Sequence, residues 1–221
     1  MTERATLAFA RVDLASREYP QRLSVVLGRS APRVVYIAGN LALLRGPLVG
    51  LLASREVDPS CLVKAGEAFQ TVIEADVCVI GGWHSPLEAT LLSGAGAGRA
   101  QLGIALATGP EHAVIPRRVR ERIEHGAAFA LTHCGSAVRR VTRAAALRRN
   151  ALVVALSDVL LVPLAPPGSA TAGVAKRAIL GGTLVLTTDA PANRELLAAG
   201  ALRFTPAALA TALAKSSPNR A

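Results

Sequence analysis

The chain has 221 residues, of which 51% are hydrophobic and 18% are charged, so it can bury a sizeable core, and the composition excludes intrinsic disorder. Lysine and arginine number 25 against 15 aspartates and glutamates, which gives a formal net charge of +10. This excess favours a polyanionic partner, with nucleic acid as the first candidate, although a codon bias toward arginine would also raise the charge.

The three cysteines (Cys61, Cys78 and Cys134) are widely spaced and form no CxxC pair, so the sequence predicts neither a disulfide framework nor a zinc site. Free thiols are typical of a reducing compartment. Residues 1–20 are charged throughout, and no window of about 20 apolar residues is free of charge. We therefore expect a cytoplasmic protein that has no membrane contact, no metal and no cofactor.

Apolar segments of strand length alternate with longer segments of helical period along the chain. In chain order the sequence predicts strands at 33–38 and 48–53, a helix at 59–75, a strand at 76–81, a helix at 86–95, a strand at 102–108, a helix at 116–125, a strand at 127–132, a helix at 137–157, a strand at 158–165, a helix at 172–180, a strand at 183–188 and a helix at 206–215.

Most of these strands are nearly continuous apolar runs, as expected for strands that are buried on both faces. The alternation predicts an α/β fold with a doubly wound, mostly parallel sheet of the extended Rossmann-like kind. We expect one such domain over residues 19–215, preceded by a short N-terminal extension (1–18) whose first 15 or so residues form a separate helix. Residues 216–221 are expected to be a frayed tail.

Binding residues are expected in the loops that follow the carboxyl ends of the strands. Ser54 and Arg55 follow the strand at 48–53, where a hydroxyl, a guanidinium and backbone N–H groups would suit a phosphate. Gly81 and Gly82 follow the next strand and would let a ligand approach the backbone. Trp83 is either a stacking platform for a base or a core residue, and His84 is interpreted as an ordinary loop residue.

The stretch "ALRRNALVVALSDVLLVPLAPPGSATAG" (146–173) suggests a second part of the same phosphate site. Arg148, Arg149 and Asn150 precede its strand, and Gly168, Ser169 and Thr171 follow that strand and open a helix. A helix start of this kind holds phosphate through backbone N–H groups. Neither a Walker A loop nor a GxGxxG dinucleotide motif is present.

Positive charge is concentrated between residues 111 and 150, where nine arginines stand against three glutamates. A basic face of this kind is typical of proteins that bind the nucleic-acid backbone, although two solvated helix surfaces would explain it as well. The arginines of this stretch that we expect at such a face are Arg117, Arg118, Arg139, Arg140, Arg143, Arg148 and Arg149.

No catalytic constellation emerges from the sequence. GxSxG and HExxH motifs are absent, and the carboxylates Asp58, Asp76, Glu88, Asp158, Asp189 and Glu195 are scattered. The residues therefore favour a binding protein over an enzyme.

The order of motifs resembles the Rossmann-like core of the DNA-processing protein A family (DprA, also called Smf). The resemblance rests on YPQRL (19–23), APRVVYIAGNLALL (31–44), LVGLLASR (48–55), RRNALVVALSDVLLV (148–162), PPGSATAGVAKRAILGGTLVLTT (166–188) and NRELLAAGA (193–201). The family's S-G-x-A-x-G-I-D-x-x-A-H segment is replaced by GGWHSPLEATLL (81–92), so the relative is divergent.

The resemblance implies binding of single-stranded DNA, homodimerisation, and loading of a RecA-type recombinase during DNA recombination or natural transformation. By position it assigns phosphate contacts to Ser54 and Arg55, with Arg149, Asn150, Ser169 and Thr171 shaping the same pocket. Two alternatives stay open: a small-nucleotide-binding or sensing protein on the same fold, and a nucleoside-monophosphate phosphoribohydrolase. Against the phosphoribohydrolase, the loop PPGSATAGVAK of this sequence lacks the glutamate that such enzymes carry in their PGGxGTxxE-like loop.

Overall fold

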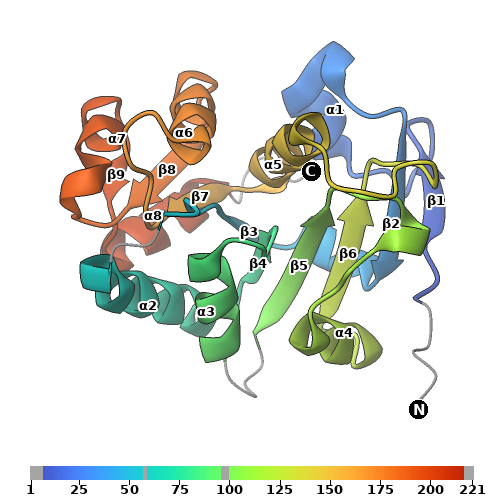
Figure 1. Ribbon diagram of the computed structural model, residues 1–221, viewed down its shortest axis with the longest axis horizontal. Coiled ribbons are helices and arrows are strands. Elements are labelled where there is room, and N and C mark those ends of the chain that lie inside the picture. The colour runs from blue at the N-terminus through green and yellow to red at the C-terminus, as the bar shows by residue number, and fades with distance from the viewer. Residues whose placement is uncertain (1–6, 57–58, 96–99, 217–221) are drawn as a thin grey trace.

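The computed structural model describes residues 7–56, 59–95 and 100–216, and these build a nine-stranded sheet with the order β1-β2-β6-β5-β4-β3-β7-β8-β9 (Figure 1). Neighbouring strands are parallel from β6 through to β9, and antiparallel at β1–β2 and β2–β6. The strands are β1 (Ala10–Asp13), β2 (Val34–Gly39), β3 (Leu48–Leu51), β4 (Cys78–Gly81), β5 (Gln101–Leu106), β6 (Ala128–Thr132), β7 (Val159–Val162), β8 (Leu184–Thr187) and β9 (Leu202–Arg203).

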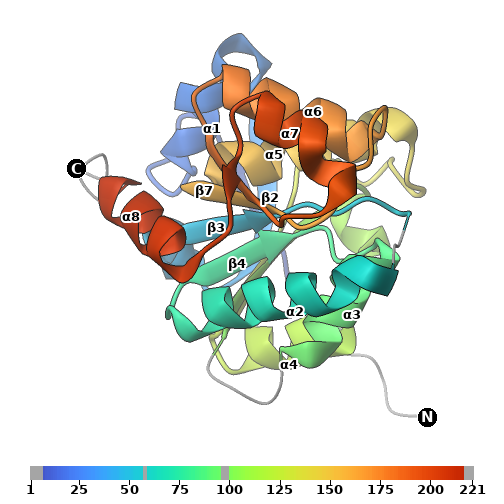
Figure 2. The same cartoon turned by 90° about the vertical axis from the view of Figure 1, so that its left-hand side faces the viewer.

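Helices cover both faces of this sheet, as Figure 2 shows edge-on. One face carries α1 (Gln21–Leu27), α5 (Arg143–Leu156), α6 (Ala170–Leu180) and α7 (Arg194–Ala198). The other carries α2 (Pro59–Glu74), α3 (Pro86–Gly94), α4 (Arg117–Glu124) and α8 (Pro206–Ser216). Each layer has its own apolar core, so the expected doubly wound, mostly parallel α/β fold is confirmed.

The central strands β3, β4 and β7 are buried along their whole length, as their continuous apolar runs predict. Gly50 lies in the middle of β3, where a Cβ atom would come within 2.2 Å of the Ser157 hydroxyl oxygen. The absence of a side chain at Gly50 therefore lets the end of α5 pack directly on the sheet.

Helix α1 is fixed by the YPQRL segment and lies outside the predicted elements. The Tyr19 hydroxyl donates to the Pro32 carbonyl over 2.7 Å, and Leu23 is fully buried. Arg22 forms an ion pair of 3.0 Å with Asp158, whose other carboxylate oxygen accepts the Leu48 N–H over 2.8 Å. These contacts attach α1 to the amino ends of β3 and β7, so the segment has a structural role.

Four other details differ from the sequence prediction. Within the segment expected to form a separate helix, Ala10–Asp13 is edge strand β1, because it pairs antiparallel with β2, and residues 1–6 lie outside the described residues. Helix α5 begins at Arg143 and not at 137, because Thr142 caps it and Gly109 binds the Val138 carbonyl. Helix α7 and strand β9 were not expected. Of the expected frayed tail, Ser216 ends α8 and 217–221 lie outside the described residues.

Asn193 holds the loop after β7 against the end of β8 and is fully buried. Its side-chain oxygen accepts the Ala165 N–H over 2.9 Å, and its amide donates to the Pro163 and Thr188 carbonyls over 2.9 and 3.1 Å. Because the backbone groups of two loops depend on one side chain, Asn193 defines the shape of the loop that precedes α6.

We predict that Asn193→Ala lowers the free energy of unfolding by about 2 kcal/mol or more, since it leaves buried backbone donors and acceptors without partners. Urea denaturation followed by circular dichroism measures this difference. The exposed neighbour Arg194 provides the control, because Arg194→Ala should change the free energy by less than about 0.5 kcal/mol. Equal stability of the two variants would contradict the role of Asn193.

Candidate functional site

The sheet has a switch point between β3 and β7, which are neighbours whose connections run to opposite faces. The chain leaves β3 toward α2 and leaves β7 toward α6, so the two loops diverge at the carboxyl ends of these strands. The Ser54 N–H donates to the Leu164 carbonyl over 2.9 Å and joins the loops at their base. Ligands of doubly wound folds bind at such a point.

The turn after β4 is fixed by Trp83, which has a positive φ of 54°. Its indole N–H donates to the Gly103 carbonyl over 2.8 Å, and its ring packs edge-on against Phe69 with centroids 6.1 Å apart. Trp83 is buried, so of the two interpretations left open for it the core residue is the correct one. The turn holds the next residue, His84, at the rim of the switch point.

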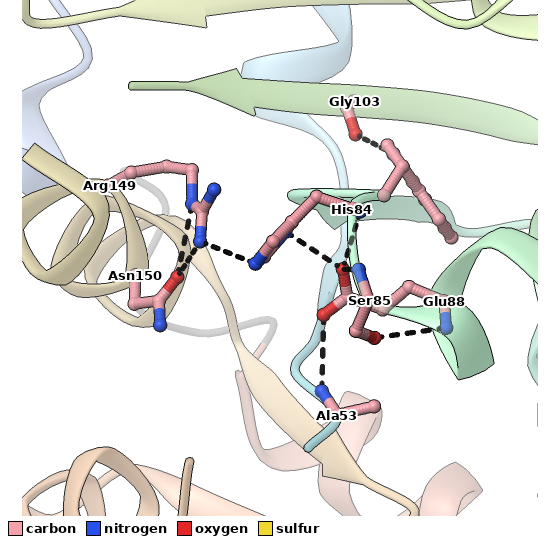
Figure 3. A network of polar contacts seen from close by, with 8 residues as sticks. Ala53, His84, Ser85, Glu88, Gly103, Arg149 and Asn150 are labelled. Carbon is pink, nitrogen blue, oxygen red and sulfur yellow. Dashed lines mark hydrogen bonds and ion pairs between the residues drawn. The ribbon is translucent and has the colours of Figure 1, made fainter. Parts of the chain in front are cut away.

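Beneath this turn lies Glu88, whose side chain is only 1% exposed. One carboxylate oxygen accepts the Ala53 N–H over 3.1 Å, and the other accepts the N–H groups of His84 and Ser85 over 3.0 and 3.4 Å (Figure 3). The Ser85 hydroxyl in turn accepts the Glu88 N–H, which completes a capping box at the start of α3. Glu88 therefore joins the loops after β3 and β4.

Burial is the largest influence on Glu88 and by itself would raise its pKa. The hydrogen bonds from His84 and from the Ala53 N–H outweigh it, and a positive charge on His84 acts in the same direction whenever that imidazole is protonated, so the pKa of Glu88 lies below its usual value. The carboxylate is therefore ionised near neutral pH.

Arg149 of α5 faces this loop from the other side and is 4% exposed (Figure 3). Its Nε and Nη2 atoms donate to the Asn150 side-chain oxygen over 3.1 and 2.9 Å, and Nη2 also lies 3.0 Å from His84 Nε2. His84 Nδ1 is 3.2 Å from Glu88. A polar chain thus runs from Glu88 through His84 to Arg149 and crosses the edge of the sheet.

Burial lowers the pKa of Arg149, the charge of Glu88 opposes this shift, and the charge of Arg55 adds to it. Arg55 is exposed on the loop after β3 and is close enough to act on Arg149. No ion pair within the described parts of the chain includes Arg149. The buried guanidinium is therefore held by two neutral acceptors, and Glu88 balances its charge only from beyond His84.

A second histidine, His133, directly follows β6 and lies near Arg148 and Arg149 of α5. Burial and the charges of Arg148 and Arg149 lower its pKa to about 4, so it is neutral at physiological pH. Its Nδ1 atom is buried without a hydrogen-bond partner among the described residues, and its Nε2 lies 3.5 Å from the Cys134 sulfur. Burial raises the pKa of Cys134, so this thiol is not activated.

The structure brings together some of the predicted site residues. Arg149 and Asn150 are in contact, and Arg55 acts on Arg149 electrostatically. Gly82 lies against the same group, because a Cβ atom there would be 2.5 Å from His84 Nδ1 and 3.2 Å from Arg149 Cζ. These residues form the Arg149 site, together with His84 and Glu88.

Other predicted residues serve local structure. The Ser54 hydroxyl accepts the Glu56 N–H, Ser169 caps α6 by accepting the Ala172 N–H, and Thr171 is buried in the first turn of that helix. Gly81 is a buried strand residue, whereas Gly168 has a positive φ of 75° in the loop.

The basic stretch does not form one face. Arg117 and Arg118 lie on α4, on the face opposite α5, and Arg117 pairs with Glu121 over 2.7 Å (Figure 2). Arg139, Arg140 and Arg143 are exposed on the loop before α5 and at its first residue. Arg148 is exposed and donates to the carbonyl of Ser30, three residues after the end of α1, over 3.3 Å.

Sequence reasoning missed His84 and Glu88, although the signal was readable. The segment HSPLE (84–88) contains the S-x-x-E spacing of a capping box and places His84 four residues before Glu88. The pattern shows that Glu88 turns back over the helix start, but only the packed structure shows that Arg149 meets His84 from another element.

A metal-ligand cluster and a membrane-spanning helix are both absent from the parts of the chain that the structure describes. These parts contain no group of three or more histidine, cysteine, aspartate or glutamate side chains placed to hold a metal ion, and none of their helices is long and apolar enough to cross a membrane. A groove of about 390 Å³ lies elsewhere, between α2, the end of β8 and the start of α8.

Comparison with known proteins places this geometry in context. DNA processing protein A from Streptococcus pneumoniae superposes with a TM-score of 0.78 at 18% identity, covering 93% of this chain and 75% of that one. DNA processing protein A from Helicobacter pylori, described for its single-stranded DNA binding mode, superposes with a TM-score of 0.73 at 17% sequence identity. The match covers 95% of this chain and 97% of that one. The molybdenum cofactor binding protein of Rippkaea orientalis superposes with a TM-score of 0.54 at 19% sequence identity, and the match covers 78% of this chain and 98% of that one. These likenesses show the fold.

No curated protein matches the sequence. The family model described as DNA recombination-mediator protein A matches residues 11–216, which is nearly the whole chain. This match covers the α1 segment, the switch point and both helical layers. The chain therefore belongs to the DNA recombination-mediator protein A family.

Proposed function

We propose that this protein binds single-stranded DNA through its phosphate backbone and that Arg149 contacts a phosphate group. The observation that carries the proposal is the state of the Arg149 guanidinium, which is almost fully buried and has only neutral groups as hydrogen-bond acceptors. A buried cation of this kind is stabilised by an anion that brings its own charge and acceptors. Within the described residues its hydrogen bonds use Nε and Nη2, which leaves Nη1 for a ligand.

Exposed arginines at the start of α5 extend this site into a track. Helix α5 begins at the carboxyl edge of the sheet, so Arg143 lies about 9 Å along the helix axis from Arg149. Arg139 and Arg140 precede it on the same loop, and Arg55 approaches from the loop after β3. Contacts through arginine to successive phosphates make binding tolerant of sequence and sensitive to salt.

Membership of the family supports a role in DNA recombination, and the proposal extends it to natural transformation. We infer that the protein works in the cytoplasm as a homodimer, delivers single-stranded DNA to a RecA-type recombinase, and carries out no reaction of its own. The Helicobacter pylori relative, described for its single-stranded DNA binding, supports the choice of ligand.

A mononucleotide is the second candidate ligand. It is favoured by the separation of the arginines onto two faces, because the excess positive charge between residues 111 and 150 is not one continuous surface. A single buried guanidinium beside Gly82 suits one phosphate group. Competition by thymidine monophosphate against a labelled oligonucleotide separates the two ligands, since full displacement at micromolar concentration would favour the mononucleotide.

We predict that Arg149→Ala weakens binding of a 30-nucleotide oligothymidylate by about ten- to a hundredfold, which is the range expected for losing hydrogen bonds to a charged group. Arg149→Lys should recover only part of the affinity, because an ammonium group cannot form the guanidinium's paired contacts. Fluorescence anisotropy measures the dissociation constants, and thermal unfolding shows whether each variant is folded. Unchanged affinity in a folded Arg149→Ala protein would overturn the proposal.

We also predict different effects for arginines on the two faces. Arg143→Gln should weaken binding and reduce the slope of log K against log salt by about one, the change expected for one lost phosphate contact. Arg117→Gln removes the same charge from α4 and should leave both quantities unchanged. Anisotropy titrations from low to high salt measure both slopes, and equal effects of the two substitutions would disprove a track confined to the start of α5.

A further inference from the structure

The hydrogen bond between Arg149 and His84 determines the protonation state of the histidine. A guanidinium has donors only, so His84 Nε2, which lies 3.0 Å from Arg149 Nη2, must be an unprotonated acceptor. The remaining proton is then on Nδ1, which lies 3.2 Å from the Glu88 carboxylate. His84 is therefore a neutral imidazole that links an anion to a cation and occupies one donor atom of the proposed phosphate site.

Protonation of His84 would change both of these contacts in opposite directions. An Nε2–H group would face the Arg149 N–H, so the hydrogen bond would be lost and two positive charges would be adjacent. The Nδ1–H contact to the ionised carboxylate of Glu88 would become a charged pair. Protonation of His84 therefore breaks its contact with Arg149 and strengthens its contact with Glu88. The Nη2 atom of Arg149 is then free to bind another acceptor.

We propose that His84 is a proton-linked gate of the Arg149 site. The neutral imidazole occupies Arg149 when no anion is bound, and a phosphate group replaces it as His84 takes up one proton from solvent and pairs with Glu88. The inference rests on the proposed function, because it assumes that Arg149 binds phosphate. The side chain of His84 is 33% exposed, which gives the incoming proton a route from solvent.

The charges around His84 favour this exchange only when an anion is present. Glu88 of α3 is the one carboxylate paired with His84 in the described parts of the chain, whereas Arg149 of α5 and Arg55 of the loop after β3 are positive. A bound phosphate offsets these positive charges and makes an imidazolium favourable. His133 lies near Arg148 and Arg149, but with a pKa of about 4 it does not change charge between pH 6 and pH 8.

The first test measures binding of a labelled 30-nucleotide oligothymidylate between pH 6 and pH 8 at constant ionic strength. The wild-type dissociation constant should fall by about tenfold for each pH unit between pH 8 and pH 6, since uptake of one proton is linked to binding. In His84→Gln, an amide that does not titrate replaces the imidazole, so the pH dependence should be lost.

The control is His125→Gln, which alters a histidine at the end of α4, remote from the Arg149 site, and should keep the wild-type pH dependence. Isothermal titration calorimetry in two buffers of different ionisation enthalpy should show uptake of close to one proton by the wild type and none by His84→Gln. If wild type and His84→Gln have the same pH dependence, the gate is disproved while DNA binding stands.

A second measurement keeps the gate testable if no oligonucleotide binds. Imidazole ¹⁵N spectra of the free protein at pH 8 should show His84 protonated at Nδ1 and bare at Nε2, and inorganic phosphate should convert it to the doubly protonated form. That result without DNA binding would overturn the proposed function but support the gate. A histidine that does not respond to phosphate, or that carries its proton on Nε2, would overturn the gate.

Discussion

The buried carboxylate of Glu88 is the group on which the arrangement of the site depends. It accepts backbone N–H groups from the loops after β3 and β4, and it is the third residue of α3, so it fixes two loops and a helix start at once. Through His84 it also reaches α5 on the opposite face of the sheet. Among the described residues, Glu88 is the negative group that balances the charge of the buried Arg149 guanidinium.

Most of the sheet could be predicted because it is built from continuous apolar runs, and periodicity identifies such strands well. Strands β3, β4 and β7 are examples, each buried along its whole length. The elements that were missed are short or lie at an edge. Strand β9 has two residues, and β1 is stable because β2 offers it a partner, which no local pattern records.

The site was predictable in part for a related reason. Arg149 and Asn150 are neighbours in the sequence, and the structure shows them in contact with each other; that they bind phosphate stays a prediction. Contacts between distant segments were not predictable: His84 and Arg149 are 65 residues apart and meet because β4 ends and α5 begins at the same edge of the sheet. The run of arginines between residues 111 and 150 suggested one basic face, but it spans two helices. Strand β6 lies between α4 and α5 in the chain, and these two helices pack on opposite faces of the sheet.

The segment most prominent in the family resemblance and the residues of the proposed phosphate site lie at opposite ends of the strands. The YPQRL segment, which is prominent in the resemblance, fixes α1 through Tyr19 and Arg22 at the amino ends of the strands. The segment in which this chain departs from the family pattern, GGWHSPLEATLL, supplies His84 and Glu88 at the carboxyl ends. A chain can therefore keep the family's scaffold while changing the groups that line the proposed phosphate site.

Trp83 makes this segment observable without any label. It is the only tryptophan in the sequence, it is buried against Phe69, and it directly precedes His84. Its indole N–H is bonded to the Gly103 carbonyl, so the chromophore is held rigidly within the turn that ends at His84, the proposed gate. The intrinsic fluorescence of the protein is therefore a signal from one place, and its wavelength and intensity follow the polarity of that turn.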